Sequence, residues 1–354
     1  MNVLFVAGGT GGHVYPALSI AKEFSKKGNH ITWIGQKDSL EERICKEEQF
    51  VFKTINPKGF LKKSFLQKIV SLYFFVVSLI HSFFIILKLR PSFVVSTGGY
   101  TSLAPSLIGA LFCPLFIHEQ NSIAGLTNRI LHKFSKVTFE AFPNTFSNLN
   151  HKVMCVGNPL RKEIIDHEFQ TEFDDSLFKI LILGGSQGSK QINDIQQDIL
   201  INRNLPSKWS FIHQVGQLES SDLRTAYENA GVKYEIKEFI DDMAEVYDDC
   251  DIVISRSGAM SISEICFIGK PSILLPLPWS SNNHQLMNAL YLKDKGAAEL
   301  IDLNKEHSQE LFKLLIELEK DHNRREKMAS RAVSVFPKDT SENIYKTINE
   351  SFSI

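Results

Sequence analysis

Two glycine-rich turns constrain the fold of this chain more than any other feature. Residues 8–13 read GGTGGH, and residues 184–189 read GGSQGS. Each turn follows a short apolar run, Val3–Ala7 in the first case and Lys179–Leu183 in the second, and each precedes a helical pattern. Glycines between a strand and a helix let the backbone approach a ligand and direct N–H groups at it. The chain therefore predicts two Rossmann-like halves in tandem.

Further apolar runs alternate with helical patterns through both halves. The other expected strands are Ile31–Ile34, Phe93–Ser96, Leu115–His118, Val137–Glu140, Val153–Val156, Ser210–Gln214, Tyr234–Lys237, Asp251–Ser255 and Ser272–Pro276. A helix is expected over residues 16–27, with Pro16 in its first turn and Gly28 at its C-terminal end. This alternation predicts an α/β fold with two doubly wound parallel-sheet domains. Since ligands of such sheets bind at the strands' carboxyl ends, we expect both glycine turns to face a central cleft.

The length of the chain, 354 residues, is sufficient for two domains. We expect the first domain over residues 1–157 and the second over residues 158–336. A polar, irregular linker over residues 158–177 opens the second domain. We expect residues 337–354, which carry the last helical pattern at Thr340–Ser351, to pack back on the first domain.

Composition narrows the class of protein. Lys and Arg number 39 against 40 Asp and Glu, a net charge of −1, which argues against a nucleic-acid partner. The five cysteines form no C-x-x-C pair, as expected of a reducing cytosol, and no signal peptide is recognised at the N-terminus. Residues 248–251 read DDCD, but Asp251 begins an expected strand and we expect the acids in the connecting turn before it. Neither a protein-held metal nor another cofactor is therefore expected.

The segment Gln49–His118 is basic and contains an apolar stretch. It has no Asp or Glu and seven Lys or Arg residues, and its apolar run covers Ile69–Leu87. Such a run can be a transmembrane helix, a buried core helix, or a helix that packs on the core and dips into a membrane surface. Ser71, Ser78 and Ser82 lie on one helical stripe, as in an amphipathic segment. We favour the third interpretation, in which residues 58–90 contact an anionic membrane surface.

The first glycine turn ends in a candidate general base. The turn does not match G-x-G-x-x-G, and no acidic residue closes the second strand, which argues against a nicotinamide dinucleotide. His13 stands beside an anion-binding loop, and a neutral imidazole is available near pH 7. The segment HEQN at residues 118–121 follows a buried strand, and its Glu119 is the rival base. The sequence does not rank the two.

A third glycine-containing segment leads from a strand into a helix. Residues 255–264 read SRSGAMSISE, whose N–H groups and hydroxyls can cradle a diphosphate. Glu264 either accepts hydroxyl hydrogens from a ribose or is an exposed helical carboxylate. Gln285 either binds sugar hydroxyls or is a polar residue at a helix start. Arg161 can reach a phosphate.

Six segments together resemble a known family. GGTGGH at 8–13, HEQNSIAGLTN at 118–128, GNPLR at 157–161, GGSQGS at 184–189, EFIDDM at 238–243 and RSGAMSISE at 256–264 match, in order, the pattern of the MurG family of peptidoglycan N-acetylglucosaminyltransferases. The resemblance implies a GT-B fold. It also implies transfer of GlcNAc from UDP-GlcNAc to the C4 hydroxyl of MurNAc in lipid I, which gives lipid II with inversion.

The resemblance also implies roles for individual residues. The family's donor contacts carry over to Thr10, Gly11, Gly12, Asn121, Arg161, Ser186, Ile240, Ala259, Met260, Ser261, Ile262, Ser263, Glu264 and Gln285. His13 matches the family's functionally important histidine. The chain departs from the family at two places: some relatives have two glutamines where it has His284-Gln285, and Ser189 stands where alanine is usual.

The resemblance further implies a location and partners. The family works peripherally on the cytoplasmic face of the bacterial plasma membrane, and proteins of cell-wall synthesis and division are candidate partners. The alternatives are another GT-B enzyme such as a UDP-GlcNAc 2-epimerase, or a non-catalytic nucleotide-sugar sensor. An epimerase needs no lipid acceptor, so the basic apolar stretch argues against it.

Overall fold

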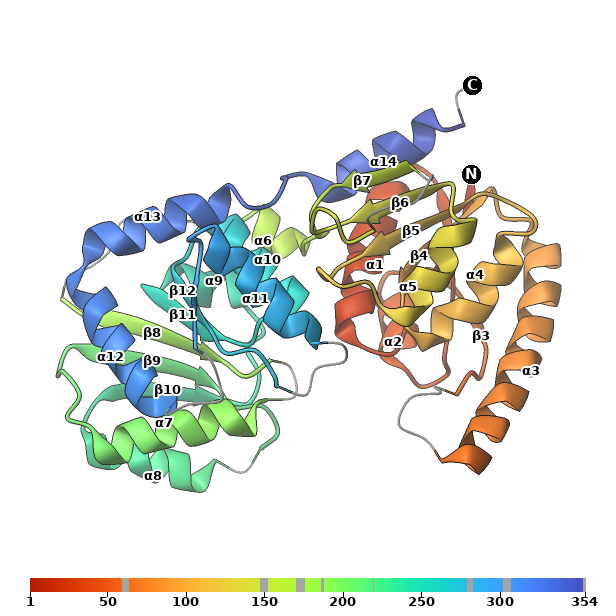
Figure 1. Cartoon of the computed structure of the whole chain (residues 1–354). Helices are drawn as coiled ribbons and strands as arrows, with labels where there is room; N and C mark the ends of the chain where they lie inside the picture. The colour runs from red at the N-terminus through yellow and green to blue at the C-terminus, as the bar shows by residue number, and fades with distance from the viewer. Residues whose placement is uncertain are drawn as a thin grey trace. The chain divides into compact units, whose positions relative to one another are not determined.

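The computed structural model describes residues 1–58, 64–146, 152–169, 176–185, 188–218, 220–278, 283–301 and 307–352. The chain divides into two compact units (Figure 1). Unit 1 comprises Met1–Arg161 and Pro337–Ile354, and unit 2 comprises Lys162–Phe336. The sequence-based boundary at residue 157 lies just before this division, and the C-terminal segment returns to unit 1 at residue 337.

Unit 1 is built on a seven-stranded parallel sheet with the order β3-β2-β1-β4-β5-β6-β7. Its strands are β1 (Asn2–Ala7), β2 (His30–Gly35), β3 (Val51–Thr54), β4 (Phe93–Gly98), β5 (Leu115–Glu119), β6 (Val137–Glu140) and β7 (Lys152–Cys155). Six of these were predicted. The edge strand β3 was missed because it is short and mostly exposed, so it lacks the apolar run of a buried strand.

Helices cover both faces of this sheet (Figure 1). They are α1 (Gly11–Lys26), α2 (Leu40–Glu47), α3 (Phe65–Leu89), α4 (Leu103–Gly109), α5 (Leu126–Leu131) and α14 (Thr340–Glu350), with 3₁₀ turns η1 (Tyr100–Ser102) and η2 (His132–Phe134). The C-terminal helix α14 packs on α1, where the rings of Phe24 and Tyr345 lie 4.9 Å apart. Ile344 and Ile348 of α14 belong to the core of unit 1.

The prediction that α1 begins near Pro16 is wrong. The helix begins at Gly11, because the carbonyl of Thr10 accepts the N–H groups of His13 and Val14 and closes a turn before the proline. Pro16 therefore lies in the second turn, where its missing N–H costs one backbone hydrogen bond. The predicted C-terminal end is confirmed, since Gly28 has a φ of +78° directly after the helix.

Unit 2 repeats the architecture with a six-stranded parallel sheet in the order β10-β9-β8-β11-β12-β13. Its strands are β8 (Phe178–Leu183), β9 (Trp209–Gln214), β10 (Lys233–Lys237), β11 (Ile252–Ser255), β12 (Ser272–Leu274) and β13 (Glu299–Leu300). Its helices are α6 (Lys162–Ile165), α7 (Lys190–Asn202), α8 (Ser221–Ala230), α9 (Met243–Asp248), α10 (Ala259–Ile268), α11 (His284–Asp294), α12 (His307–Lys320) and α13 (His322–Val333). The predicted irregular linker over residues 158–177 thus contains the short helix α6.

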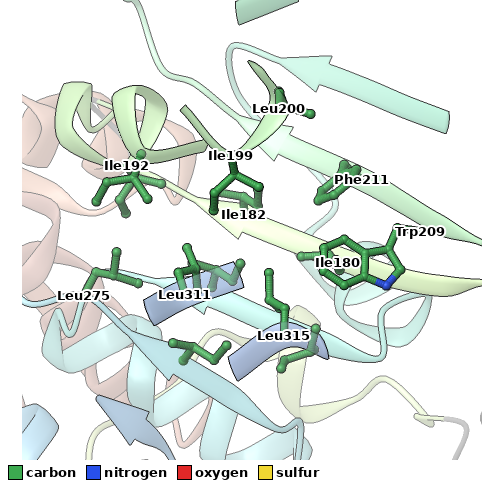
Figure 2. Close-up of a cluster of buried hydrophobic side chains, with 14 of the residues drawn as sticks. Ile180, Ile182, Ile192, Ile199, Leu200, Trp209, Phe211, Leu275, Leu311 and Leu315 are labelled. Carbon is green, nitrogen blue, oxygen red and sulfur yellow. The ribbon is translucent and has the colours of Figure 1, made fainter. Parts of the chain in front are cut away.

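The core of unit 2 lies between its sheet and the helices α7 and α12 (Figure 2). Ile180 and Ile182 of β8 point into it together with Ile199 of α7. Leu311 and Leu315 of α12 complete the cluster, and all five side chains are buried. This packing holds β8 rigid, and β8 carries the second glycine turn at its carboxyl end.

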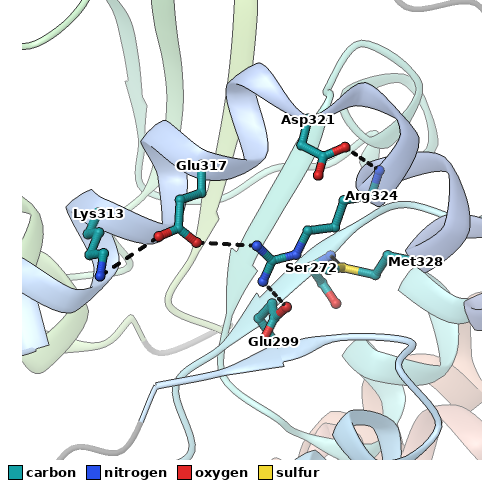
Figure 3. Close-up of polar contacts among 7 residues, drawn as sticks. All are labelled: Ser272, Glu299, Lys313, Glu317, Asp321, Arg324 and Met328. Carbon is teal, nitrogen blue, oxygen red and sulfur yellow. Dashed lines mark hydrogen bonds and ion pairs between the residues drawn. The ribbon is translucent and has the colours of Figure 1, made fainter.

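The two-residue edge strand β13 is held by an ion-pair network (Figure 3). The guanidinium of Arg324 in α13 binds Glu299 of β13 and Glu317 of α12. The two partners come from consecutive elements of the chain, and the arginine of the next helix joins them. Because these side chains are partly exposed, the network contributes little free energy, and its main effect is to fix the position of a short strand.

Candidate functional site

His13 lies in the first turn of α1 and is held by residues of two neighbouring strands. Its Nδ1 lies 3.0 Å from the backbone oxygen of Thr97 and 2.9 Å from Oε1 of Gln120. The hydroxyl of Thr97 donates to the backbone oxygen of His13 at 2.7 Å. A backbone oxygen only accepts hydrogen bonds, so Nδ1 carries the proton in the neutral ring. Nε2 then has the lone pair that a general base requires.

A glycine pair at the end of β4 packs against the first glycine turn. Gly99 has a φ of +89°, and a Cβ there would lie 2.1 Å from the backbone oxygen of Gly8. Only glycine allows this approach. The sequence analysis missed Gly98-Gly99, although the pair follows the predicted strand Phe93–Ser96 just as the other turns follow theirs.

Glu119 is almost fully enclosed and organises its own loop. It is 1% exposed. Its Oε1 accepts hydrogen bonds from the backbone and side-chain N–H groups of Asn121. Its Oε2 accepts from the backbone N–H of Gly125 and the side-chain amide of Asn128, and the four distances are 2.9–3.3 Å. Four hydrogen bonds occupy the acceptor capacity of a carboxylate. The geometry therefore favours His13 over Glu119 as the base.

The other predicted site residues of unit 1 are Thr10, Gly11 and Gly12, directly before His13, and Arg161, much further along the chain. Thr10 and Gly12 are exposed, and Gly11 is half-buried at the N-terminus of α1. A Cβ at Gly12 would have no backbone atom within 4 Å, so this turn is open at that point. Arg161 is half-buried and ends the first segment of unit 1.

The second glycine turn leads into α7. Gly188 has a φ of +77°, and a Cβ there would lie 2.1 Å from the backbone oxygen of Val215. The predicted donor contact Ser186 lies outside the described residues. Ser189 caps α7 by accepting the N–H of Ile192. Its hydroxyl also accepts a hydrogen bond of 2.7 Å from Arg256, a contact that the family's usual alanine could not make.

Arg256 connects this turn to the third glycine segment. Its guanidinium also donates to Oε1 of Gln191 at 3.0 Å and to the backbone oxygen of Leu275 at 2.9 Å. Burial lowers the pKa of Arg256 to about 10, so the side chain stays charged at neutral pH. It adds a half-buried positive charge beside the predicted diphosphate cradle.

The N-terminus of α10 and the start of α11 are joined by hydrogen bonds. The hydroxyl of Ser257 donates to the backbone oxygen of Gln285 at 2.7 Å, and Asn288 donates to the backbone oxygen of Ser257 at 3.2 Å. Oε1 of Gln285 accepts the N–H of Leu277 at 2.8 Å. Gly258 begins α10 with no side-chain cap. The structure therefore brings the predicted diphosphate cradle and the predicted sugar contact together.

The remaining residues that were predicted to contact the sugar donor are mostly buried. Glu264 is 5% exposed and accepts a hydrogen bond of 3.4 Å from Tyr247, so it is not the exposed helical carboxylate that the sequence left open. Ile240 and Ala259 are buried, whereas Met260 and Ser261 are half-buried. The hydroxyl of Ser263 donates a hydrogen bond to the backbone oxygen of Ala259. Ile262 has its side chain in the core and its N–H bonded to Gly258.

The acids at residues 248–251 have protein partners. Asp248 lies 3.4 Å from His167, Asp249 pairs with Lys179, and Asp251 accepts the N–H of Lys179 at 2.7 Å. Within the described ranges, no three His, Cys, Asp or Glu residues are grouped to hold a metal ion.

The serines of helix α3 face the protein, and an apolar side of the helix is exposed. Ser71, Ser78 and Ser82 are buried, and α3 packs against α4. Ser71 and Ser78 donate to backbone oxygens one turn earlier, so these hydroxyls are satisfied within the helix and the neighbour can approach closely. The exposed large apolar residues are Ile69, Val70, Leu72, Tyr73, Val76, Ile80, Phe83, Phe84 and Leu87, which we call the outer face of α3. Of the described helices, only Ile69–Leu89 is long and apolar enough to cross a membrane.

The comparisons with known proteins agree with this architecture. The model of the glycosyltransferase family 28 N-terminal domain matches residues 3–140, and that of the C-terminal domain matches residues 179–344. The UDP-N-acetylglucosamine--N-acetylmuramyl-(pentapeptide) pyrophosphoryl-undecaprenol N-acetylglucosamine transferase of Shewanella frigidimarina is 36% identical over 324 residues, 89% of this chain and 88% of that protein.

Solved structures are similar to this chain over nearly its whole length. The crystal structure of Acinetobacter baumannii MurG superposes with a TM-score of 0.81 at 29% identity and covers 99% of both chains. UDP-GlcNAc 2-epimerase from Neisseria meningitidis, bound to UDP-GlcNAc, gives a TM-score of 0.70 at 16% identity over 99% of this chain and 100% of that one, a similarity of fold alone. The predicted GT-B class is therefore confirmed, and the chain belongs to glycosyltransferase family 28.

Proposed function

We propose that this chain transfers GlcNAc from UDP-GlcNAc to the C4 hydroxyl of MurNAc in undecaprenyl-pyrophosphoryl-MurNAc-pentapeptide, lipid I, and so forms lipid II. The observation that carries the proposal is the near full-length similarity to a relative whose name states this donor and acceptor. The reaction is inverting: the acceptor hydroxyl attacks the anomeric carbon opposite the departing UDP. It requires a base for the hydroxyl proton and stabilisation of the leaving diphosphate.

Unit 1 supplies the base and is the acceptor domain in this proposal. His13 takes the hydroxyl proton on Nε2, which is supported by the two acceptor oxygens that hold its Nδ1. Proton transfer by a positioned side chain typically contributes ~10²–10⁴-fold in rate. Glu119 keeps the loop after β5 in shape through its four hydrogen bonds. Thr10, Gly11, Gly12 and Asn121 are proposed donor contacts of the same unit.

Unit 2 is the donor domain in this proposal. The N-terminus of α10, residues 257–261, stabilises the diphosphate with backbone N–H groups, aided by Ser186 and by Arg161 of unit 1. Ile240 meets the uracil through its backbone. Glu264 accepts hydroxyl hydrogens from the ribose, and Gln285 binds sugar hydroxyls. No protein-held metal is included, because charge on the diphosphate is balanced by the helix N-terminus and the arginine.

The outer face of α3 is the proposed membrane contact. Its exposed Phe, Leu, Ile, Val and Tyr side chains form an apolar surface of the kind that inserts into a lipid interface. Lys88 and Arg90 are exposed at one end of α3. Lys58 lies 4.1 Å from the ring of Phe74. Each such cation adds about 1 kcal/mol of attraction to anionic lipid, which supports a peripheral location at the cytoplasmic face of the membrane.

Release of UDP tests the proposed function. The purified chain is incubated with UDP-GlcNAc, with and without a lipid I analogue. We expect UDP release that requires the analogue. Turnover of UDP-GlcNAc to its C2 epimer without acceptor would indicate an epimerase, and donor binding without turnover would indicate a sensor; either result would contradict the proposal.

A further inference from the structure

The amide of Gln120 has a fixed direction between two histidines. Its Oε1 lies 2.9 Å from Nδ1 of His13. Its Nε2 lies 3.0 Å from the backbone oxygen of His118 and 3.1 Å from Nδ1 of the same residue. Since a backbone oxygen only accepts, the NH₂ group must face His118. The amide oxygen therefore faces His13, independently of how the two ends of the amide are assigned.

His118 ends this series of hydrogen bonds at the backbone. It is 0% exposed, and its Nε2 lies 2.9 Å from the backbone oxygen of Gly157. That oxygen only accepts, so Nε2 carries the proton. Burial lowers the pKa of His118 to about 4, so the ring is neutral at physiological pH. Its Nδ1 then has a lone pair, which accepts a hydrogen bond from the amide of Gln120. In this series His13 donates to Gln120, and Gln120 donates to His118.

We propose that Gln120, oriented by neutral His118, is a positioning residue for His13 that holds its imidazole as the Nδ1–H tautomer. An unconstrained neutral imidazole exists as two tautomers, and the Nε2–H form cannot accept a proton at Nε2. Thr97 gives Nδ1–H one acceptor through its backbone. Gln120 gives the second acceptor and fixes the plane of the ring. The catalytic consequence rests on the proposed function, whereas the tautomer is a property of the protein without substrate.

Nitrogen-15 spectroscopy reads the tautomers directly. The full chain is labelled with ¹⁵N-histidine and studied near pH 7 by long-range ¹H–¹⁵N correlation, with His13→Gln and His118→Asn to assign the two rings. We expect His13 as Nδ1–H and His118 as Nε2–H. In Gln120→Leu we expect the Nε2–H form of His13 to appear. We also expect kcat to fall about tenfold while the donor KM stays nearly unchanged.

Two further variants separate positioning from folding. The side chain at position 120 is 1% exposed, and burial favours the protonated form of a carboxyl group there. Protonated Gln120→Glu keeps an oxygen acceptor for Nδ1–H of His13 and an O–H donor for His118, so it should restore the Nδ1–H tautomer and most of kcat. Gln196→Leu makes the same apolar change at a glutamine of unit 2 that is 1% exposed, and it should leave the His13 spectrum and kcat as in the wild type. Equal losses in Gln120→Leu and Gln120→Glu would indicate a purely structural role and overturn the proposal.

The spectra test the positioning role of Gln120, and UDP release tests the proposed function, so the two can fail separately. A wild-type His13 in the Nε2–H form would overturn the positioning role, as would an unchanged His13 spectrum in Gln120→Leu, whatever the rate. If the wild type releases no UDP with the acceptor, the proposed function fails. The tautomer in Gln120→Leu still decides whether Gln120 positions His13.

Discussion

The two units use the same crossover in different ways. In unit 1, α3 leads from the edge strand β3 to β4, and in unit 2, α9 leads from the edge strand β10 to β11. The helix α3 has 25 residues and an exposed apolar outer face, whereas α9 has 6 residues, with Ala244, Val246 and Tyr247 buried. The sheet tolerates both lengths. The additional length of α3 is therefore not needed to cover the sheet, which agrees with the proposal that its outer face contacts a membrane.

The same contrast extends to the chemistry. Unit 1 carries the base in our account, and unit 2 carries the donor contacts. If this division is right, changes at His13 affect kcat, whereas changes at Glu264 affect the donor KM.

Replacing His13 by Gln should cause the largest loss. Removal of a general base lowers kcat by about 10²–10⁴-fold, because the acceptor hydroxyl must then lose its proton to water. The donor KM should change little. Steady-state kinetics with saturating donor and lipid I analogue measure both. Near-normal kcat would exclude His13 as the base and would contradict the proposal that unit 1 carries the base.

The two sides of α3 should differ in stability. Ile86 is 1% exposed, so Ile86→Ala should lower the free energy of unfolding by about 2–5 kcal/mol. Leu72 is 55% exposed, so Leu72→Ala should change it by less than about 0.5 kcal/mol. Denaturant unfolding of the two variants provides the comparison. Similar losses at both positions would show that the outer face is covered by protein in solution.

Glu264→Gln should weaken donor binding. A hydrogen bond to a charged group contributes about 1.5–3 kcal/mol, so the donor KM should rise by about ten- to a hundredfold while kcat changes less. Isothermal titration with UDP-GlcNAc gives the binding constant independently. An unchanged KM would refute the ribose contact.

Single substitutions on α3 should separate membrane contact from core. Phe84 is 64% exposed, so Phe84→Ser should weaken binding to anionic vesicles by about tenfold or more without a loss of folding. Phe83→Ser should act in the same direction, because Phe83 is 38% exposed. Phe74 and Phe75 are half-buried, so serine there should reduce stability as well. Vesicle sedimentation and thermal unfolding measure the two effects, and unimpaired sedimentation of Phe84→Ser would disprove the contact.

Acid should destabilise both units through buried histidines. Burial lowers the pKa of His118 in unit 1 to about 4 and that of His213 in unit 2 to about 3, from 6.5. The unfolded state then binds protons that the native state cannot. The contribution of each histidine to the free energy of unfolding is therefore fully present above about pH 6.5. It falls by about 1.4 kcal/mol per pH unit between that pH and the native pKa of about 4 for His118 or about 3 for His213. Urea unfolding at about pH 7 and about pH 5 measures the slope, which His213→Gln should reduce; an equal slope in that variant would contradict the assignment.

The sequence predicted the two sheets because buried parallel strands are continuous apolar runs. It missed β3 and β13, which are short edge strands whose formation depends on a neighbour rather than on their own residues. It also predicted that residues 69–87 form a helix and that its serines share one stripe. It could not show that this stripe faces inward, because the direction depends on α4, which packs against α3.

At the candidate site, residue type and order along the chain were enough to name His13, Glu264 and Gln285 as candidates, and their roles stay predictions. They were not sufficient to rank His13 against Glu119, since both are polar residues at strand ends. The distinction comes from the four hydrogen bonds that occupy Glu119, two of which involve Gly125 and Asn128, several residues further along the chain. Gln120 shows the same limit, because its proposed role depends on a contact with His13, which lies far from it in the chain.

The most direct test of the account is the structure of the reaction product. The wild-type chain is incubated with UDP-GlcNAc and a lipid I analogue, and the purified product is studied by NMR. Our account predicts a single GlcNAc joined to the C4 oxygen of MurNAc, with the anomeric configuration inverted relative to the donor. A product with retained configuration, or a linkage at any other oxygen, would contradict it.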